Sequence, residues 1–292
     1  MSRSYTRLSM VAALVLLCGL ASGLQANTIS YWRFEGDLND SVGGHHITNN
    51  SGVGFTESGL WNPVPNPDGN VTNGDQNSDA ADFGGTDVFN YAYADDSDDW
   101  TQSGGFTIEA MVNVSGFTED SPETLVSHWN SLDQEKSWVF EINDADAPQL
   151  RLSGNSGDAV AAFSASEFSL ETGKTYALAA AFDGSEVTFF GKEKGVTYDG
   201  KQYLKSDPVD VSSIGILNNA SEELFFGMTG DSSNAFGGTM DEVRFSSGAL
   251  GEADLLATPE PATTCLALAA AAAGVFAVWR KKRKENPEED AA

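Results

Sequence analysis

The sequence predicts an all-β domain, an antiparallel β-sandwich, between two apolar terminal segments. Three observations indicate this fold class. Short runs of alternating apolar and polar residues recur along the chain, as in Phe106–Val114, where Ile108 and Val112 share one face. Gly, Asn, Asp and Ser separate these runs. Helical periodicity is almost absent, which favours packed sheets over a mixed fold.

The N-terminus has the layout of a secretory signal peptide. Arg3 and Arg7 precede the apolar stretch Leu8–Leu17, and Leu24-Gln25-Ala26 ends in a small residue. A basic start, an apolar middle and a small residue at the cleavage point are the parts of such a signal. We therefore predict that residues 1–26 form a signal helix, that signal peptidase removes it, and that the chain is exported.

Residues 27–257 form the predicted sandwich, a length that one all-β domain can fill. Asp183-Gly184 predicts a hairpin turn between two strands. The polar stretch Asn62–Asp82 predicts a long surface loop, and Ala249–Leu256 predicts a short helix. The expected strands are Ile29–Phe34, Phe106–Val114, Thr124–Trp129, Ser137–Ile142, Gln149–Ser153, Ala159–Phe163, Tyr176–Phe182, Val187–Phe190, Val209–Ile216, Leu224–Met228 and Thr239–Ser246.

The C-terminus combines three elements. Pro259-Glu260-Pro261 precedes eighteen mainly apolar residues, Ala262–Trp279, and the basic run Arg280–Lys284 follows at once. Eighteen helical residues extend about 27 Å, enough for a bilayer core. A basic run stays on the cytoplasmic side of a membrane. The sequence therefore predicts a transmembrane helix over 262–279, with the acidic tail 285–292 in the cytoplasm.

This order of motif, apolar helix and basic run resembles the PEP-CTERM sorting signal of Gram-negative bacteria. The resemblance implies that residues 258–284 are a sorting signal, and that exosortase, a membrane transpeptidase, recognises Pro259, Glu260 and Pro261 before the helix is discarded. It also implies residence in the inner membrane before processing, and at the cell surface or in the extracellular matrix afterwards. The helix and charges alone would equally support an ordinary C-terminal membrane anchor.

Four motifs inside the domain resemble laminin-G-like domains, which are jelly rolls of the concanavalin A type. The motifs are Tyr31–Ser41 at the opening strand, Gly105–Val112 at a central strand, Lys174–Gly184 at a strand and hairpin, and Phe236–Phe245 at the closing strand. The resemblance covers nearly all of residues 28–256 and implies a jelly-roll sandwich. It leaves the ligand open, because this architecture serves lectins, glycosidases, adhesins and structural modules.

The charge of the domain excludes some partners. Nine of the 16 basic residues and thirty-eight of the 43 acidic residues lie within 27–257, so the domain carries a net charge of −29. Nucleic acid and anionic membrane surfaces are therefore not expected to bind. Both cysteines lie in the terminal apolar segments, so no disulfide is expected in the domain. Solubility in a salty habitat and binding of divalent cations both explain the acidic surplus.

A calcium ion is the expected cofactor. Asp241 is predicted to share a face with Val243 and Phe245, where a carboxylate must be paired, hydrogen-bonded or bound to a cation. In related jelly rolls a structural calcium links the first and last strands, and the resemblance places Glu35 and Asp241 at the matching positions. The alternative is that Asp241 only accepts backbone N–H bonds at a strand end.

Aromatic rings beside loops are the expected ligand-binding residues, because a ring face packs against the C–H face of a pyranose. His128, Trp129 and Asn130 stand at the start of a hairpin, and Trp61 and Trp100 lie beside loop sequence. Extracellular polysaccharide is the expected partner. Trp32 and Trp138 alternate with strand neighbours and are expected in the core.

No catalytic residue is predicted. The Glu-x-Asp-x-x-Glu pattern of jelly-roll glucanases is absent, and Glu141, Asp144 and Asp146, which come nearest to it, run into a turn. Glu109 is interpreted as a polar surface residue. We therefore expect a non-catalytic carbohydrate-binding or matrix-associated module. The alternatives are a purely structural surface or adhesion module and a glycan-cleaving enzyme.

Overall fold

The computed structural model describes residues 27–57, 59–61, 77–84, 90–102, 104–118, 121–198 and 201–257. Ala26–Thr258 forms one compact unit. The predicted signal peptide, the Pro259-Glu260-Pro261 motif and the helix predicted over 262–279 lie outside the described residues. Among the residues that are described, no helix is long and apolar enough to cross a membrane.

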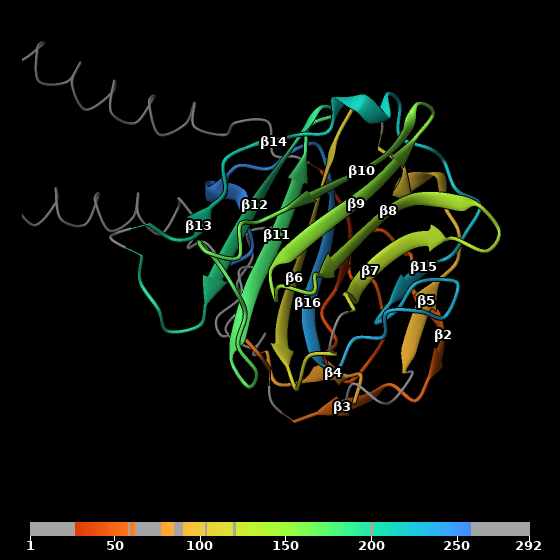
Figure 1. Ribbon diagram of the computed structural model, residues 1–292. Coiled ribbons are helices and arrows are strands. Elements are labelled where there is room, and N and C mark those ends of the chain that lie inside the picture. The colour runs from red at the N-terminus through yellow and green to blue at the C-terminus, as the bar shows by residue number, and fades with distance from the viewer. Residues whose placement is uncertain are drawn as a thin grey trace, which may run out of the picture. The chain divides into compact units, whose positions relative to one another are not determined.

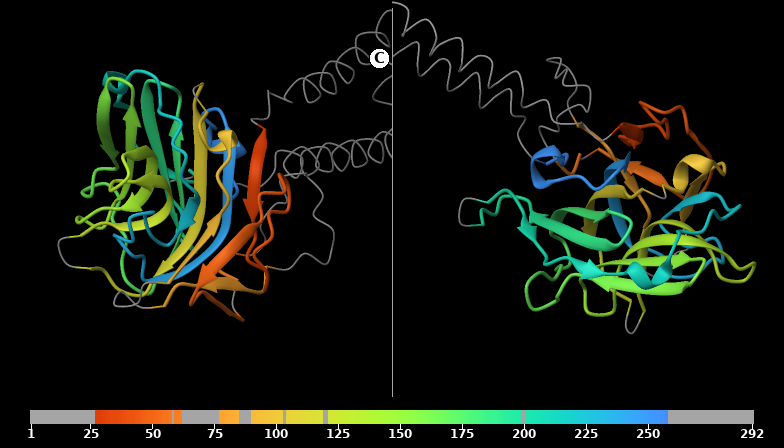
Figure 2. Two further views of the ribbon diagram at one scale, coloured as in Figure 1. Left: turned by 90° about the vertical axis from the view of Figure 1, so that its right-hand side faces the viewer. Right: turned by 90° about the horizontal axis from the view of Figure 1, so that it is seen from above.

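Two antiparallel sheets lie face to face, with β8, β9 and β10 crossing in front of β6, β11 and β16 in Figure 1. Figure 2 shows the same layers from two further directions. The strand order in the first sheet is β13 (Leu204–Lys205), β12 (Glu186–Glu193), β11 (Thr175–Phe182), β6 (Phe106–Val114), β16 (Gly238–Ser247), β4 (Ala80–Asp82) and β3 (Gly54–Thr56). In addition, β1 (Thr28–Trp32) pairs with β16, and β14 (Val209–Asp210) pairs with β12.

The second sheet has seven strands in the described part of the chain. Their order is β10 (Gly157–Ala162), β9 (Pro148–Gly154), β8 (Glu135–Ile142), β7 (Glu123–Asn130), β15 (Leu224–Phe226), β5 (Tyr91–Ala94) and β2 (Ile47–Ser51). Three short 3-10 helices complete the described elements: η1 (Asp98–Trp100), η2 (Ser212–Ile214) and η3 (Glu252–Asp254). The predicted all-β sandwich is therefore confirmed.

The core lies between the sheets and is rich in aromatic rings. Phe245 of β16 stacks on Trp138 of β8 with ring centroids 5.4 Å apart, and Phe106 lies 5.3 Å from each of them. The Trp138 indole N–H donates to the Trp100 carbonyl at 2.8 Å, so burial leaves no unpaired donor there. Trp32 and Trp138 are fully buried, as the sequence predicted.

Several predicted elements differ from the structure. The strand expected over Val209–Ile216 is the short β14 followed by η2, and the helix expected over Ala249–Leu256 is only the three-residue η3. Part of the predicted loop Asn62–Asp82 is β4. The short strands β2, β3 and β5 were not predicted, because runs of three to five residues carry little periodic signal.

An apolar cluster also covers the opposite face of the first sheet. We call it the outer cluster, and it comprises Tyr31, Leu60, Trp61, Ala80, Met111, Ala177, Ala179, Ala181, Phe190, Tyr203, Leu250, Leu255, Leu256 and Ala257. The segment 250–257 therefore packs on this sheet instead of leaving it. The Tyr203 hydroxyl accepts a bond from the Ala257 N–H at 3.0 Å, so the fold is fixed up to that residue.

A buried ion pair lies beneath this segment. Arg244 of β16 donates to Glu109 of β6, and Glu109 also accepts the Leu256 N–H at 2.8 Å. Arg244 further donates to the Asp254 carbonyl at 2.7 Å. The prediction that Glu109 is a surface residue is wrong. Its strand face was assigned correctly, but the segment 250–257 covers that face, and Glu109 is 3% exposed.

Candidate functional site

A β-bulge in β16 places two consecutive carboxylates on one face of the first sheet. Asp241 opposes Met111, whereas Arg244 opposes Glu109, so β16 advances by three residues where β6 advances by two. Glu242, in the bulge, has a φ of 49°, which is rare for a residue other than glycine. Met240 faces the core, and the extra residue leaves Asp241 on the opposite, outer face.

The bulge overturns one prediction. Asp241 does not share a face with Val243 and Phe245, because strict alternation fails where a residue is inserted. Val243 and Phe245 point into the core, while Asp241 is directly opposite Met111 of the outer cluster. The Asp241 carboxylate is nevertheless fully buried, at 0% exposure. It therefore still needs a hydrogen-bond donor, a paired charge or a cation, but on the outer face of the sheet.

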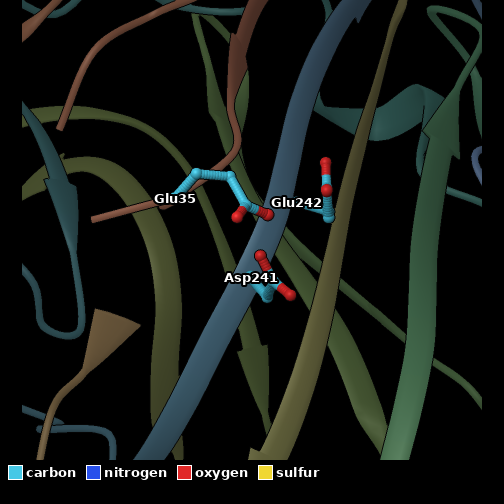
Figure 3. Close-up of side chains that lie close together, drawn as sticks. All are labelled: Glu35, Asp241 and Glu242. Carbon is cyan, nitrogen blue, oxygen red and sulfur yellow. The ribbon is translucent and has the colours of Figure 1, made fainter. Parts of the chain in front are cut away.

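Glu35, Asp241 and Glu242 lie together, and we call them the acidic cluster. One carboxylate oxygen from each lies within 4.8 Å of the other two. Glu35 comes from the segment after β1, and Figure 3 shows its carboxylate pointing toward that of Asp241. Phe34, just before Glu35, has a φ of 55°. Both segments of the cluster therefore contain a residue with a costly left-handed backbone conformation, Phe34 on one and Glu242 on the other.

Four segments of the chain meet at the acidic cluster. Asp241 Oδ2 accepts the Leu60 N–H at 2.9 Å and the Asn77 side-chain N–H at 2.7 Å. Asn77 also donates to Glu242 Oε1 at 2.9 Å. Glu35 Oε2 accepts both the backbone N–H and the hydroxyl of Ser78 at 2.9 Å. The carboxylates therefore tie the segments 59–61 and 77–84 to the ends of β1 and β16.

Charge around the cluster is unbalanced. Arg33 lies 3.5 Å from Glu242 and 3.8 Å from Glu35, so its guanidinium pairs with two of the three carboxylates. Burial, and next the charge of Glu242, raise the pKa of Asp241 to about 8. Burial likewise raises the pKa of Glu242 to about 7, although the hydroxyl of Tyr31 donates to it and Arg33 opposes the rise.

The cluster fits a calcium ion in donor type and spacing. Calcium holds oxygen ligands at about 2.3–2.6 Å, so two ligands of one ion lie at most about 5 Å apart. The three carboxylates meet that limit. Glu35 Oε1 and Asp241 Oδ1 are buried atoms that accept no hydrogen bond from any described residue. Glu35 Oε1 has the Arg33 guanidinium at 3.8 Å, beyond hydrogen-bond distance, so both oxygens keep lone pairs for a cation. Glu35 and Asp241 were predicted from the sequence as calcium ligands, whereas Glu242 and Asn77 were not predicted to belong to this site.

The hairpin residues predicted to bind sugar lie together at the end of β7, but all are buried. His128 is fully buried opposite Trp138, with Nε2 3.5 Å from Asp96, and burial lowers its pKa. Trp129 is 4% exposed, and its ring is covered by Lys136 and Arg151 at 5.3 and 5.2 Å from the centroid. Asn130 closes the hairpin by accepting the N–H groups of residues 132 and 133.

The other two predicted rings lie elsewhere. Trp61 belongs to the outer cluster of the first sheet, with Lys192 5.6 Å from its ring. Trp100 ends η1, is 0% exposed, and packs 5.8 Å from Trp32 and 4.6 Å from His45. Trp100 is therefore a core residue, because η1 turns its side chain inward from an acidic loop. The structure does not bring these two rings to the hairpin.

The carboxylates considered for catalysis are not a free pair. Glu141 lies in β8 with a fully buried side chain, where Arg151 approaches to 2.8 Å and Gln149 donates at 2.6 Å. Asp144 and Asp146 lie in the turn that follows β8, as predicted.

Comparison with known proteins supplies a family. A family model, Laminin_G_3, described as the concanavalin A-like lectin/glucanases superfamily, matches residues 83–255. The match begins after β1, so Glu35 lies outside it while Asp241 and Glu242 lie within it. A comparison with curated proteins gave no significant match.

Several solved structures are similar to this chain at low sequence identity, and the two with a TM-score above 0.5 share its fold. The binding domain of botulinum neurotoxin serotype G has a TM-score of 0.52 and 13% identity, covering 77% of this chain and 49% of that one. The binding domain of Paraclostridial Mosquitocidal Protein 1 gives 0.51 and 13%, covering 77% and 50%. Domain 4 of AbnA, an extracellular arabinanase from Geobacillus stearothermophilus in complex with arabinotriose, gives 0.48 and 16%, covering 79% and 97%. The chain spans about half the length of the two toxin domains.

Proposed function

The chain belongs to the concanavalin A-like lectin/glucanases superfamily, and from this premise we propose that it is an exported, non-catalytic glycan-binding module of the cell surface or extracellular matrix. The observation that carries the proposal is the two-sheet sandwich of this superfamily, matched over 83–255, behind a sequence with the layout of an export signal. Lectins and glucanases share the superfamily, so the placement of acids is what favours binding over cleavage.

Two groups of buried acids in the described part of the chain favour binding over cleavage. Glycoside hydrolysis needs two carboxyl groups about 5–10 Å apart that flank an accessible bond. The acidic cluster is packed under the segments 59–61 and 77–84, and Glu141 is neutralised by Arg151, so neither presents such a pair to solvent.

Ser30, His45 and Asp99 contact one another in the same order as the Ser, His and Asp of a nucleophilic triad. Ser30 Oγ lies 2.8 Å from His45 Nδ1, and Asp99 lies 3.2 Å from His45 Nε2. Ser30 is 0% exposed, however, so its hydroxyl has no path to a substrate carbonyl. This geometry supports a structural role, in which Ser30 and Asp99 hold the His45 ring against Trp100.

Binding of soluble polysaccharides by the full chain, purified in detergent, tests the proposal. Affinity electrophoresis through gels that contain laminarin, arabinan, galactomannan or alginate should retard the chain on at least one of them. Release of reducing sugar from the same polysaccharides would instead support a glycan-cleaving enzyme. If the chain is not retarded and releases no sugar, the purely structural module is favoured.

We also propose that calcium is the cofactor and that the acidic cluster binds it. The oxygen-only donor set and the two carboxylate oxygens without hydrogen-bond donors support this role. When bound, the ion would neutralise carboxylates that are otherwise costly to bury, and Glu35, Asp241 and Glu242 would hold it between the segment after β1 and β16. The role is structural, because the side chains of Asp241 and Glu242 are fully buried and that of Glu35 is only 21% exposed.

Calcium should raise the melting temperature of the 27–257 domain. A ligand present at a hundred times its dissociation constant adds about 2.7 kcal/mol, or about 5–10 °C for a domain of this size. Asp241→Asn should make the curves in calcium and in chelator coincide, because Asp241 Oδ1 is one of the two oxygens left open. Asp158→Asn, at a surface carboxylate with 55% of its side chain exposed, is the matched control and should keep the shift. Equal melting of the unaltered domain in both buffers would contradict the calcium role.

Sorting by exosortase is the third part of the proposal. The order of Pro259-Glu260-Pro261, Ala262–Trp279 and Arg280–Lys284 supports it, and the domain is fixed up to Ala257, immediately before the motif. We expect intact-mass spectrometry of the native host's surface fraction to find a chain that ends near Pro261. Glu260→Ala should cause the unprocessed chain to accumulate in the membrane. Recovery of only the full-length chain from unaltered cells would favour the permanent anchor.

A further inference from the structure

The outer face of the second sheet carries three aromatic rings side by side. Tyr93 of β5 is directly opposite Phe225 of β15, and Tyr91 lies two residues away on the same face. Ring centroids are 5.3 Å apart for Tyr93 and Phe225, and 6.4 Å apart for the two tyrosines, whose planes differ by only 11°. We call this group the tyrosine platform.

The platform faces away from the core. The residues between and beside its members, Ala92, Ala94, Leu224 and Phe226, are fully buried on the inner face. Both tyrosines keep part of their surface exposed, while Phe225 behind them is 7% exposed. Trp129, on the neighbouring β7, has its ring covered by two basic side chains, so it offers less free surface than the tyrosines do.

Hydrogen-bonding groups lie at the edge of the platform. A Cβ atom built on Gly230 would stand 2.7 Å from Glu222 Oε1 and 3.1 Å from Phe225 Cε2, so glycine here lets the carboxyl group approach the ring. Asn130, whose Nδ2 donates to Asp133 Oδ2 at 3.0 Å, also acts on Glu222. Burial, opposed by the Asn130 side chain and assisted by Glu223, raises the pKa of Glu222 to about 7, so at neutral pH its carboxyl group can both donate and accept.

The negative charge near the platform disfavours anionic sugars as ligands. Glu223 and Asp133 are close enough to Glu222 to raise its pKa, and residues 27–257 carry a net charge of −29. Uronic acids, sulfated sugars and sialic acids would meet repulsion. A neutral sugar offers an apolar C–H face to the rings and hydroxyl groups to the carboxyl and amide groups.

From this juxtaposition we propose that the tyrosine platform, edged by Glu222 and Asn130, is the binding surface for a neutral polysaccharide. The inference rests on the proposed glycan-binding function and names its site and the class of sugar. The site differs from the five residues that the sequence analysis selected, of which only Asn130 lies at its edge. An apolar protein partner is disfavoured, because the Glu222 carboxyl group stands beside the Phe225 ring and two further acidic residues act on Glu222.

Affinity electrophoresis of variants of the full chain tests this surface. Tyr91→Ala combined with Tyr93→Ala should weaken binding to the neutral polysaccharide found for the unaltered chain by at least tenfold. Tyr91→Phe combined with Tyr93→Phe should keep most of the binding, because the ring faces remain. Phe55→Ala, at an aromatic residue 39% exposed on β3 of the other sheet, is the matched control and should not change affinity. Melting curves establish that each variant is folded.

The outcomes separate the surface from the function. A folded double alanine variant that binds a neutral polysaccharide as tightly as the unaltered chain would overturn the platform while leaving glycan binding in place. Binding to alginate but to none of the neutral polysaccharides would overturn the neutral class. If the unaltered chain binds no polysaccharide, the proposed function fails and the platform proposal fails with it. If the double alanine variant loses binding tenfold while the double phenylalanine and Phe55→Ala variants keep it, both the glycan-binding function and the tyrosine platform are supported.

Discussion

Arg244→Met is expected to lower the free energy of unfolding of the 27–257 domain by about 3–5 kcal/mol, the usual cost of breaking a buried ion pair from one side. Glu109 would lose its only guanidinium partner among the described residues while remaining under the segment 250–257. The variant would also lose the bond from Arg244 to the Asp254 carbonyl, so the end of the domain should loosen. Denaturant unfolding measures the loss directly.

Two comparisons identify the buried charge as the cause. Burial already raises the pKa of Glu109, and without Arg244 that carboxyl group must take up a proton to stay buried. The loss should therefore be smaller at pH 5 than at pH 8, and Glu109→Gln added to Arg244→Met should recover part of it. Lys174→Met removes the ion pairs with Glu171 and Glu193 at an exposed lysine and should leave the stability almost unchanged. A similarly small cost for Arg244→Met would show that the pair contributes little.

The layer architecture was predictable because it depends on local alternation. The predicted strand Phe106–Val114 coincides with β6, and Asp183-Gly184 does form a hairpin turn, with Gly184 at a φ of 98°. Each of these features is encoded within ten residues or fewer. The short strand β5 carries the tyrosine platform, and its four residues were too few to stand out, so the surface proposed for glycan was not found from the sequence.

Features that depend on distant segments or on irregular register were missed. The sequence offers one signal for the bulge, the consecutive acids Asp241-Glu242 in a strand that otherwise alternates between polar and apolar residues, because strict alternation would have put one of them in the core. Nothing local indicates that residues 250–257 return to cover Glu109. The sequence does not indicate that Trp100 turns into the core either, since four of the five residues before it are aspartates.

In chelator, the 27–257 domain is expected to lose stability as the pH rises from about 5 to about 8. Asp241 and Glu242 titrate at about 8 and about 7 in the folded chain, whereas ordinary Asp and Glu side chains titrate near pH 4. Between those values the folded state holds protons that the unfolded state has released. The free energy of unfolding therefore falls with rising pH, by up to about 1.4 kcal/mol per pH unit for each group.

Calcium should remove most of that slope, because the ion replaces the protons on ionised carboxylates and its own contribution grows as pH rises. The experiment is a series of denaturant titrations from pH 5 to pH 9, with and without calcium. Asp241→Asn identifies the group, since it should leave only the part of the pH slope that is due to Glu242 and should also abolish the calcium effect. Glu222→Gln is the matched control: burial also raises its pKa to about 7, but it lies apart from the acidic cluster, so its calcium effect should persist. Parallel chelator curves for the unaltered domain and Asp241→Asn would mean that Asp241 is ionised in the fold without a cation, held by the Leu60 and Asn77 donors alone.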